Sequence, residues 1–225
     1  MTPPRVPTSL ALILCTTLAA CGSRSPLRDD DASAGSTADV PPGPCPIAFD
    51  DTVRGTLQVT ADDQYRLYLT GRLIDDLPRL WSSPQQYSVQ LFRHPSRRNA
   101  IAIEATNTLN QDGRDRGVLV DLRLTVDGQV RTLVTDTSWR LTTQLVAGWF
   151  DVDFTAPGWS TPVDEGAHPI GPWGPVFGTS TARWLWSFDS NRPAASKPIR
   201  ETVWVRRAFY FGADGAIRDT PGPCP

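Results

Sequence analysis

The chain has 225 residues, of which 40% are hydrophobic, 9% aromatic and 20% charged, and its formal net charge at pH 7 is −2. This is the composition of a globular protein, and its scattered, nearly balanced charges exclude a basic surface of the kind that binds nucleic acid. Only two histidines are present, His94 and His168, and neither stands at a spacing typical of a metal site or a catalytic triad. The motifs GxSxG and HExxH and the phosphate-binding loop are missing from the sequence, so we predict no catalytic residues and no enzyme.

The first 20 residues have the pattern of a signal peptide. Arg5 precedes an apolar run over residues 10–14, which is too short to cross a bilayer, and small residues follow it. The next motif, Leu18-Ala19-Ala20-Cys21, resembles a bacterial lipobox, which implies cleavage before Cys21 and attachment of lipid, including a palmitate-type chain, to its sulfur. The alternative is a secreted protein in which this cysteine is incidental. We therefore expect a lipoprotein of the bacterial cell envelope whose only membrane partner is its lipid, and Gly22 favours the outer membrane.

Residues 21–44 predict a disordered tether. The stretch contains Asp29-Asp30-Asp31, then a run of small polar residues, and ends in the Pro-rich segment 41–44, with almost nothing apolar to bury. The remaining residues, 45–225, are of a length that suits one domain with its own core.

The cysteines predict one disulfide bond. Cys15 leaves with the signal peptide and Cys21 is consumed by lipid, so that Cys45 and Cys224 remain, each within the sequence Pro-Gly-Pro-Cys-Pro. In an oxidising compartment these two would join the ends of the domain. A metal site is the alternative, but it is disfavoured because no histidine lies near either cysteine.

Strand patterns dominate the domain. The predicted strands are Thr56–Thr60, Gln64–Thr70, Ala100–Ala105, residues 118–125, Gln129–Val134, Arg183–Phe188 and Thr202–Phe211. Asp127-Gly128 predicts a tight hairpin, and Asp214-Gly215 predicts a final turn before Ala216-Ile217-Arg218. Many short strands with Gly- and Pro-rich connections favour an all-β sandwich or barrel. Residues 155–180 are expected to form a long loop, a kind of segment that often carries function.

Several segments resemble galactose-binding-like β-sandwich domains. They are Val59–Ile74, Arg98–Asn107, Gly117–Leu124 and Val134–Trp139, followed by tryptophans at 149, 159, 173, 184 and 186 in the same order. The resemblance covers about residues 50–211 and implies an antiparallel jelly-roll. It also departs from the family in two places, where Thr70-Gly71 replaces Asn-Gly and Thr155–Trp159 replaces an acidic run. If the family uses those two positions to hold ligand rather than to shape a turn, the resemblance does not imply ligand binding by this chain.

The candidate ligand-binding residues are loop tryptophans and one acidic pair: Trp81, Trp149, Trp159, Trp173, Asp62 and Asp63. Indole faces stack on the apolar faces of sugar rings, although tryptophans also fill the interiors of sandwiches, as we expect for those in the strand patterns. Asp62 and Asp63 have the oxygen ligands of a calcium site, but they also suit a turn, which we favour. We therefore predict no cofactor.

The main functional hypothesis is a non-catalytic β-sandwich that binds carbohydrate or another surface polymer. The alternatives are a structural or protein-interaction module at the cell surface, with its tryptophans all buried, and a non-catalytic accessory to a glycoside hydrolase. Exposure of Trp149, Trp159 or Trp173 in a concave, polar-rimmed patch would separate the first two.

Overall fold

A computed structural model of the chain describes residues 51–78, 80–108, 116–188 and 200–223. The predicted signal peptide, Cys21, the predicted tether, Cys45 and Cys224 lie outside the described residues. None of the residues in these ranges belongs to a helix that could span a membrane.

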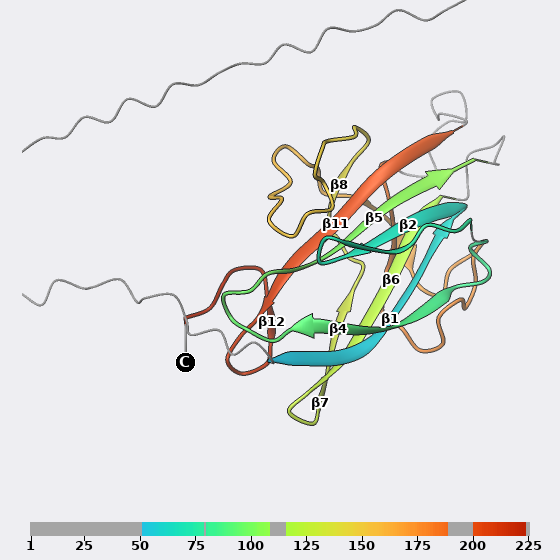
Figure 1. Ribbon diagram of the computed structural model, residues 1–225. Helices are drawn as coiled ribbons and strands as arrows, with labels where there is room; N and C mark the ends of the chain where they lie inside the picture. Colours follow the sequence, from blue (N-terminus) through green and yellow to red (C-terminus); the bar gives the residue numbers. More distant parts are fainter. Residues whose placement is uncertain (1–50, 79, 109–115, 189–199, 224–225) are drawn as a thin grey trace, which may run out of the picture. The chain divides into compact units, whose positions relative to one another are not determined.

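The described chain folds into two antiparallel sheets of six strands each (Figure 1). The first sheet has the strand order β4 (Gln85–Phe92), β1 (Thr52–Asp62), β6 (Gly117–Val126), β10 (Arg183–Trp186) and β9 (Val163–Ala167), with β7 (Gln129–Val134) also paired to β6. The second sheet has the order β12 (Ile217–Arg218), β11 (Glu201–Phe211), β5 (Asn99–Asn107), β2 (Gln64–Leu69) and β3 (Arg72–Asp75), with β8 (Arg140–Thr142) also paired to β11. This confirms the predicted antiparallel β-sandwich.

Two hairpins show how local sequence fixes the strand register. Asp127 and Gly128 have φ angles of 51° and 73°, which are the two positive angles that a type I′ turn between β6 and β7 requires. Thr70 and Gly71 have φ angles of 49° and 81° and connect β2 to β3 in the same way. Thr70-Gly71 therefore shapes a turn, the role that Asn-Gly fills in many hairpins.

The main core lies between the two sheets and follows the period-two alternation of the strands. The inward residues of β6 are Val118, Val120, Leu122 and Leu124, as the sequence predicts, and all are buried. They pack in one cluster with the buried residues of β5 and β11, among them Ile101, Ile103, Val203 and Val205.

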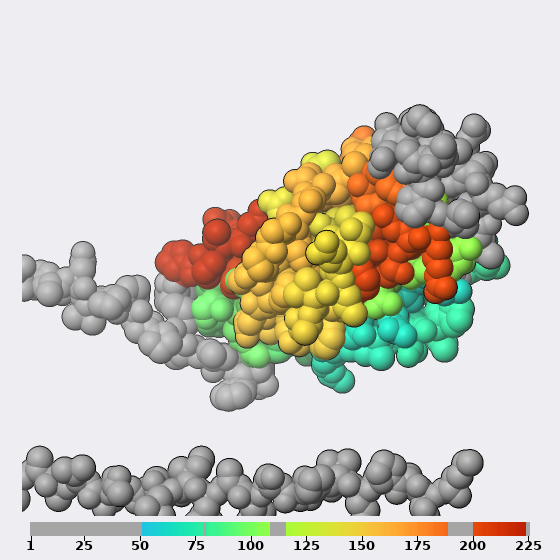
Figure 2. All heavy atoms as spheres, turned by 90° about the horizontal axis from the view of Figure 1, so that it is seen from above, coloured from blue at the N-terminus to red at the C-terminus, as the bar shows by residue number. Residues whose placement is uncertain are grey.

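Residues 143–182, here called the covering segment, supply two further hydrophobic clusters. One contains Trp149 and Trp159 with Ala102 of β5, and the other contains Trp173 and Phe177 with Leu119 of β6. Ala102 and Leu119 alternate with the inward residues of their strands, so each cluster covers the outer face of one sheet. In Figure 2 the gold atoms of this segment occupy the centre of the face in view. The loop predicted at 155–180 is thus largely a packed layer, interrupted by β9.

At one edge of the sandwich, three polar side chains link the sheets. The phenol of Tyr87 in β4 donates a hydrogen bond to Asp75 Oδ2 at 2.6 Å, and its oxygen lies 2.8 Å from the hydroxyl of Tyr65 in β2. Because β4 belongs to the first sheet and both partners to the second, the bonds join the two sheets where the main core ends.

Candidate functional site

Two of the candidate tryptophans, Trp149 and Trp159, pack on the outer face of the second sheet. Trp149 is 3% exposed and meets the ring of Tyr68 edge-on, with 5.3 Å between ring centroids. Trp159 is 9% exposed and packs against Phe154 at 5.6 Å. Both indoles thus belong to the aromatic layer that attaches the covering segment to the strands below it.

The third loop tryptophan, Trp173, packs on the first sheet and joins another candidate, Asp62. Its ring is 4% exposed and stacks on Trp184 with centroids 4.2 Å apart. Its Nε1 donates to Asp62 Oδ2 at 2.9 Å. Trp81 is half-buried against the same cluster, and its carbonyl oxygen accepts a hydrogen bond from Thr60 at 2.9 Å. Asp62 and Trp173 are thus joined by a structural hydrogen bond, and Trp81 packs against the cluster that contains Trp173.

Asp63 binds a residue just after β5, not the backbone of its own turn that the turn interpretation expects. Its Oδ2 accepts the backbone N–H and the hydroxyl of Thr108, at 2.7 and 2.9 Å. Within the described residues, no group of three or more histidine, cysteine, aspartate or glutamate side chains could hold a metal ion.

The indoles therefore do not form the exposed, concave patch that a sugar-stacking site needs. Trp149, Trp159 and Trp173 are each at least nine-tenths buried, because each ring fills a cluster between the covering segment and a sheet. A ring packed on both faces offers none to a pyranose. We conclude that a ligand site must be sought elsewhere on the described surface.

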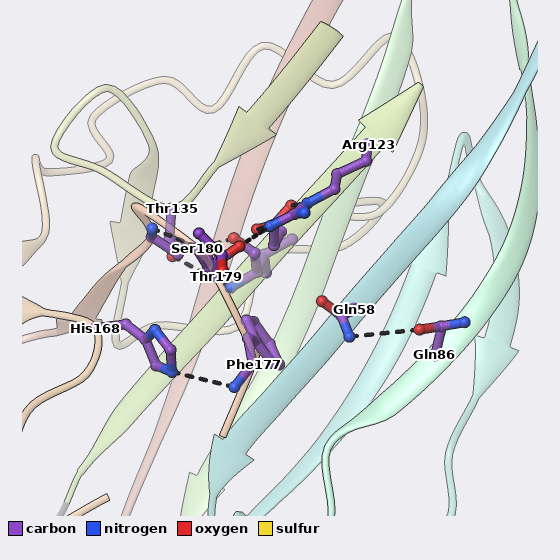
Figure 3. A network of polar contacts seen from close by, with 11 residues as sticks. Gln58, Gln86, Arg123, Thr135, His168, Phe177, Thr179 and Ser180 are labelled. Atoms are coloured by element: carbon purple, nitrogen blue, oxygen red, sulfur yellow. Dashed lines mark hydrogen bonds and ion pairs between the residues drawn. The ribbon is translucent and has the colours of Figure 1, made fainter. Parts of the chain in front are cut away.

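Polar contacts hold parts of the covering segment together and attach it to the first sheet (Figure 3). The Nε2 atom of His168 accepts the backbone N–H of Phe177 at 3.1 Å. Arg123 of β6 pairs with Asp121 at 2.9 Å and donates to the carbonyl oxygen of Thr179. The hydrogen bond to Asp121 raises the pKa of Arg123 above its ordinary value. His168 thus has a structural role here.

A surface pocket of about 260 Å³ lies beside the other half of the covering segment. Its charged side chains are four arginines and one aspartate, and Phe154 is its aromatic side chain. The lining residues are Arg98, Ser138, Arg140, Phe154, Thr155, Ala156, Arg206, Arg207, Ala208 and Asp219. We call it the arginine pocket. Its lining residues alone carry a formal charge of +3, whereas the whole chain is slightly acidic.

Strand β11 supplies the two central cations of the arginine pocket. Arg206 is only 3% exposed, and its Nη2 donates to the carbonyl oxygens of Asp151 and Val152 at 2.7 and 3.0 Å. Arg207 donates from Nη1 to the carbonyl oxygen of Ser138 at 2.7 Å and pairs with Asp219 through Nη2. The covering segment therefore holds one guanidinium by its own backbone.

Two further arginines complete the pocket from other elements. Arg98, just before β5, donates from Nε to the hydroxyl of Tyr210 at 2.8 Å and from Nη1 to the carbonyl oxygen of Asp153 at 3.3 Å. Arg140 is exposed in β8 and donates to the hydroxyl of Thr161 at 3.1 Å. Burial, followed by repulsion from Arg98, lowers the pKa of Arg206 to about 10. The charge of Arg206 is thus held in an unfavourable environment.

The sequence analysis did not identify these arginines. One signal was present in the alternation of β11, where Arg206 shares a face with Trp204 and Ala208. An arginine on the same strand face as apolar residues indicates a buried cation, and a buried cation needs hydrogen-bond or charge partners. Arg98, Arg140 and Asp219 could not be joined to it, because only the fold brings their segments together.

Comparisons with known proteins are sparse for this chain. No protein-family model and no curated protein matches it. Among solved structures, a Pleurotus ostreatus lectin in its apo form is similar to it, with a TM-score of 0.48 and 26% identity over 60% of this chain and 38% of the lectin chain. A Streptomyces avermitilis α-L-rhamnosidase complexed with L-rhamnose gives a TM-score of 0.43 and 16% identity over 75% of this chain and 24% of that chain. The chain thus spans well under half the length of either protein.

Proposed function

We propose that this chain is a lipid-anchored bacterial envelope protein whose β-sandwich binds a polysaccharide without catalysing a reaction on it. The arginine pocket is the observation that carries the proposal. Guanidinium and hydroxyl donors line it beside the ring of Phe154, which gives hydrogen-bonding groups for sugar hydroxyls and an apolar wall for a ring.

The histidines support a non-catalytic role. His94 Nδ1 lies 2.9 Å from the hydroxyl of Ser96, two residues along the chain, and the Nε2 of His168 accepts a backbone N–H. Both rings are buried. Their described contacts are those of side chains that stabilise loops.

Glycan binding is tested with the full chain in detergent on an array of bacterial and plant polysaccharides. We expect binding to at least one polysaccharide class, and a weaker signal for Arg140→Gln, because this substitution removes an exposed donor from the pocket. Arg54→Gln is the matched control, because Arg54 is exposed on β1 and is not among the residues that line the pocket. Absence of binding to every polysaccharide would overturn the proposal.

The lipid anchor is supported by the motif that ends in Cys21, and it is tested separately. Radiolabelled palmitate fed to expressing cells should enter the wild-type protein and be lost in Cys21→Ser. Equal labelling of the two proteins would show that the lipid is not on this cysteine.

A protein partner is the second candidate function, and two observations favour it: the burial of Trp149, Trp159 and Trp173, and an exposed apolar segment. Large apolar side chains are exposed close together in and after β3: Leu73, Ile74, Leu77 and Leu80. Exposed apolar patches often mark interaction sites. A photo-crosslinking residue at position 77 in living cells should then give a discrete protein adduct, while one at exposed Val130 on β7 should not. Identical adduct patterns would count against this function.

A further inference from the structure

The arginine pocket contains hydrogen-bond donors that the described residues do not use. The Nε atoms of Arg206 and Arg207 are buried and have no hydrogen-bond partner among the described residues. A buried donor left unsatisfied costs about 1–3 kcal/mol, and more when the group is charged. Such donors are therefore expected to meet an acceptor when the protein is in its working state.

The charge around these donors selects the kind of acceptor. Burial disfavours the charged form of Arg206 most and repulsion from Arg98 adds to this effect, while Asp153 and Asp151 offset part of it. The carboxylates near these arginines belong to exposed residues. One of them, that of Asp219, pairs with Arg207. A neutral hydroxyl would accept a hydrogen bond but would not reduce the repulsion between the two cations. An anion would do both.

Geometry and size define the anion further. Guanidinium N–H groups donate short, charge-assisted hydrogen bonds to the oxygens of a carboxylate or sulfate. At about 260 Å³ the pocket is smaller than sites for drug-sized ligands, which span roughly 300–1,000 Å³. It therefore suits one charged sugar residue of a longer chain, with Phe154 as the wall for the ring.

We propose that the arginine pocket binds the oxyanion substituent, a carboxylate or a sulfate, of an acidic polysaccharide. This inference rests on the proposed function, that the domain binds glycan, and names the class of glycan. Arg140 is the exposed cation of the pocket, and the buried Arg206 adds positive charge from its wall.

Calorimetry of the full chain in detergent with two matched pairs of probes tests this directly. The first pair is hexagalacturonate and its methyl ester, and the second is a dextran sulfate fragment and dextran of equal length. We expect the charged member of at least one pair to bind at least about tenfold more tightly than the neutral member, as one or two charge-assisted hydrogen bonds predict. The two pairs distinguish a carboxylate from a sulfate.

Variants separate the pocket from the general charge of the protein. Arg140→Gln and Arg206→Gln should each weaken binding of the charged probe by at least about tenfold. Arg54→Gln removes the same charge far from the pocket lining and should stay within about twofold. Arg140 is exposed, so its variant tests the pocket even if Arg206→Gln fails to fold, which circular dichroism would reveal.

Each contrary outcome identifies which proposal fails. Equal affinity for charged and neutral probes would overturn the oxyanion inference and leave glycan binding standing. Equal losses in Arg54→Gln and Arg140→Gln would also overturn it, since binding would then follow overall charge. Binding of free galacturonate or inorganic sulfate at the pocket, without binding of any oligosaccharide, would overturn the proposed function and retain an oxyanion site.

Discussion

At the scale of single residues, Tyr87 shows how one buried hydroxyl makes stability depend on pH. Its phenol donates to the carboxylate of Asp75 and touches the hydroxyl of Tyr65. Burial first, and then the hydrogen bond to Asp75, raises the pKa of Tyr87 well above its ordinary value of 10. The neutral phenol is thus the form that the folded state holds.

This raised pKa predicts a loss of stability in alkali. Because the unfolded chain ionises near pH 10 and the folded chain does not, the contribution of Tyr87 is fully present below pH 10 and falls as pH rises above it. Urea denaturation at pH 8 and pH 11 should therefore show a smaller fall in unfolding free energy for Tyr87→Phe than for the wild type. An equal fall in the two proteins would contradict the prediction.

The bond between Trp173 and Asp62 is a second prediction at this scale. We expect a coupling free energy of unfolding of about 1.5–3 kcal/mol between Trp173→Phe and Asp62→Ala. Each single variant loses the hydrogen bond to the buried charged group, and the double variant loses the same bond only once, so the two effects do not add. Urea unfolding of both single variants and the double variant measures it. Purely additive effects would show that Trp173 stabilises the protein by packing alone.

Residue roles were the part of this protein least predictable from sequence. The tryptophans suggested a sugar site because they follow strands, yet whether an indole is covered depends on which distant segment lies over it. Trp149 and Trp173 are buried by contacts with Tyr68 and Trp184, residues that no local pattern pairs with them. The acidic pair was no more predictable, because Asp63 binds Thr108 and Asp62 binds the indole of Trp173, both far away in the sequence.

At the scale of elements, close approach of β6 to its neighbour β10 requires a glycine at the start of β6. A Cβ placed on Gly117 would lie 2.5 Å from Cε3 of Trp184, one ring of the stacked indole pair. The absence of a side chain at this position thus allows the indole stack to lie flat on the strand.

We therefore predict that Gly117→Ala destabilises the domain by about 1–3 kcal/mol, the usual cost of overpacking. Near-ultraviolet circular dichroism should also lose intensity as the indole pair shifts. Gly178→Ala is the matched control: an added Cβ there meets nothing within 4 Å, so its unfolding free energy should be unchanged or slightly raised. A neutral effect of Gly117→Ala would show that Trp184 has room to move.

Most strands with a clear alternation were predicted, whereas three short strands and one longer strand, β4, were missed. The clear patterns of β2, β5, β6, β7 and β11 gave strands close to their observed bounds. Strand β4 has the same signal in Tyr87, Val89 and Leu91, but it was not identified. The strands β3, β8 and β9 have five residues or fewer, too few for a pattern, and each forms because a neighbouring strand offers it a partner.

At the scale of the whole molecule, both described ends of the domain bind to one short segment. Arg93 donates its backbone N–H to the carbonyl oxygen of Asp51, and Gly222 donates to that of Pro95. Asp51 lies six residues after Cys45, and Gly222 lies two residues before Cys224. The two described ends of the domain, each close to one cysteine in the sequence, therefore meet at the same segment. This convergence supports the proposed disulfide.

A nonreducing proteolytic digest should thus yield one linked pair of peptides containing Cys45 and Cys224. Reduction should lower the free energy of unfolding by up to about 5 kcal/mol, since the bond would close a loop of nearly the whole domain. Cys45→Ser with Cys224→Ser should match the reduced wild type. Two free thiols in the protein isolated from the envelope would contradict the pairing.

The fold class was predictable at this scale, whereas the arginine pocket was not. Alternation and turn residues are local properties, and together they specify a two-sheet sandwich. The pocket joins Arg98, Arg140, Arg206 and Asp219, whose proximity depends on β8, β5 and β11 meeting in one sheet.

The position of β11 between β5 and β12 makes the order of synthesis important. By residue 134 the chain has made β4, β1, β6 and β7, which pair with one another, but β5 then has β2 on one side and no neighbour on the other. A nine-residue sheet edge, Asn99–Asn107, stays open until residue 211 has been made. Truncation before residue 201 would leave that edge free to pair with other chains, so the last strands protect the domain from edge-to-edge aggregation.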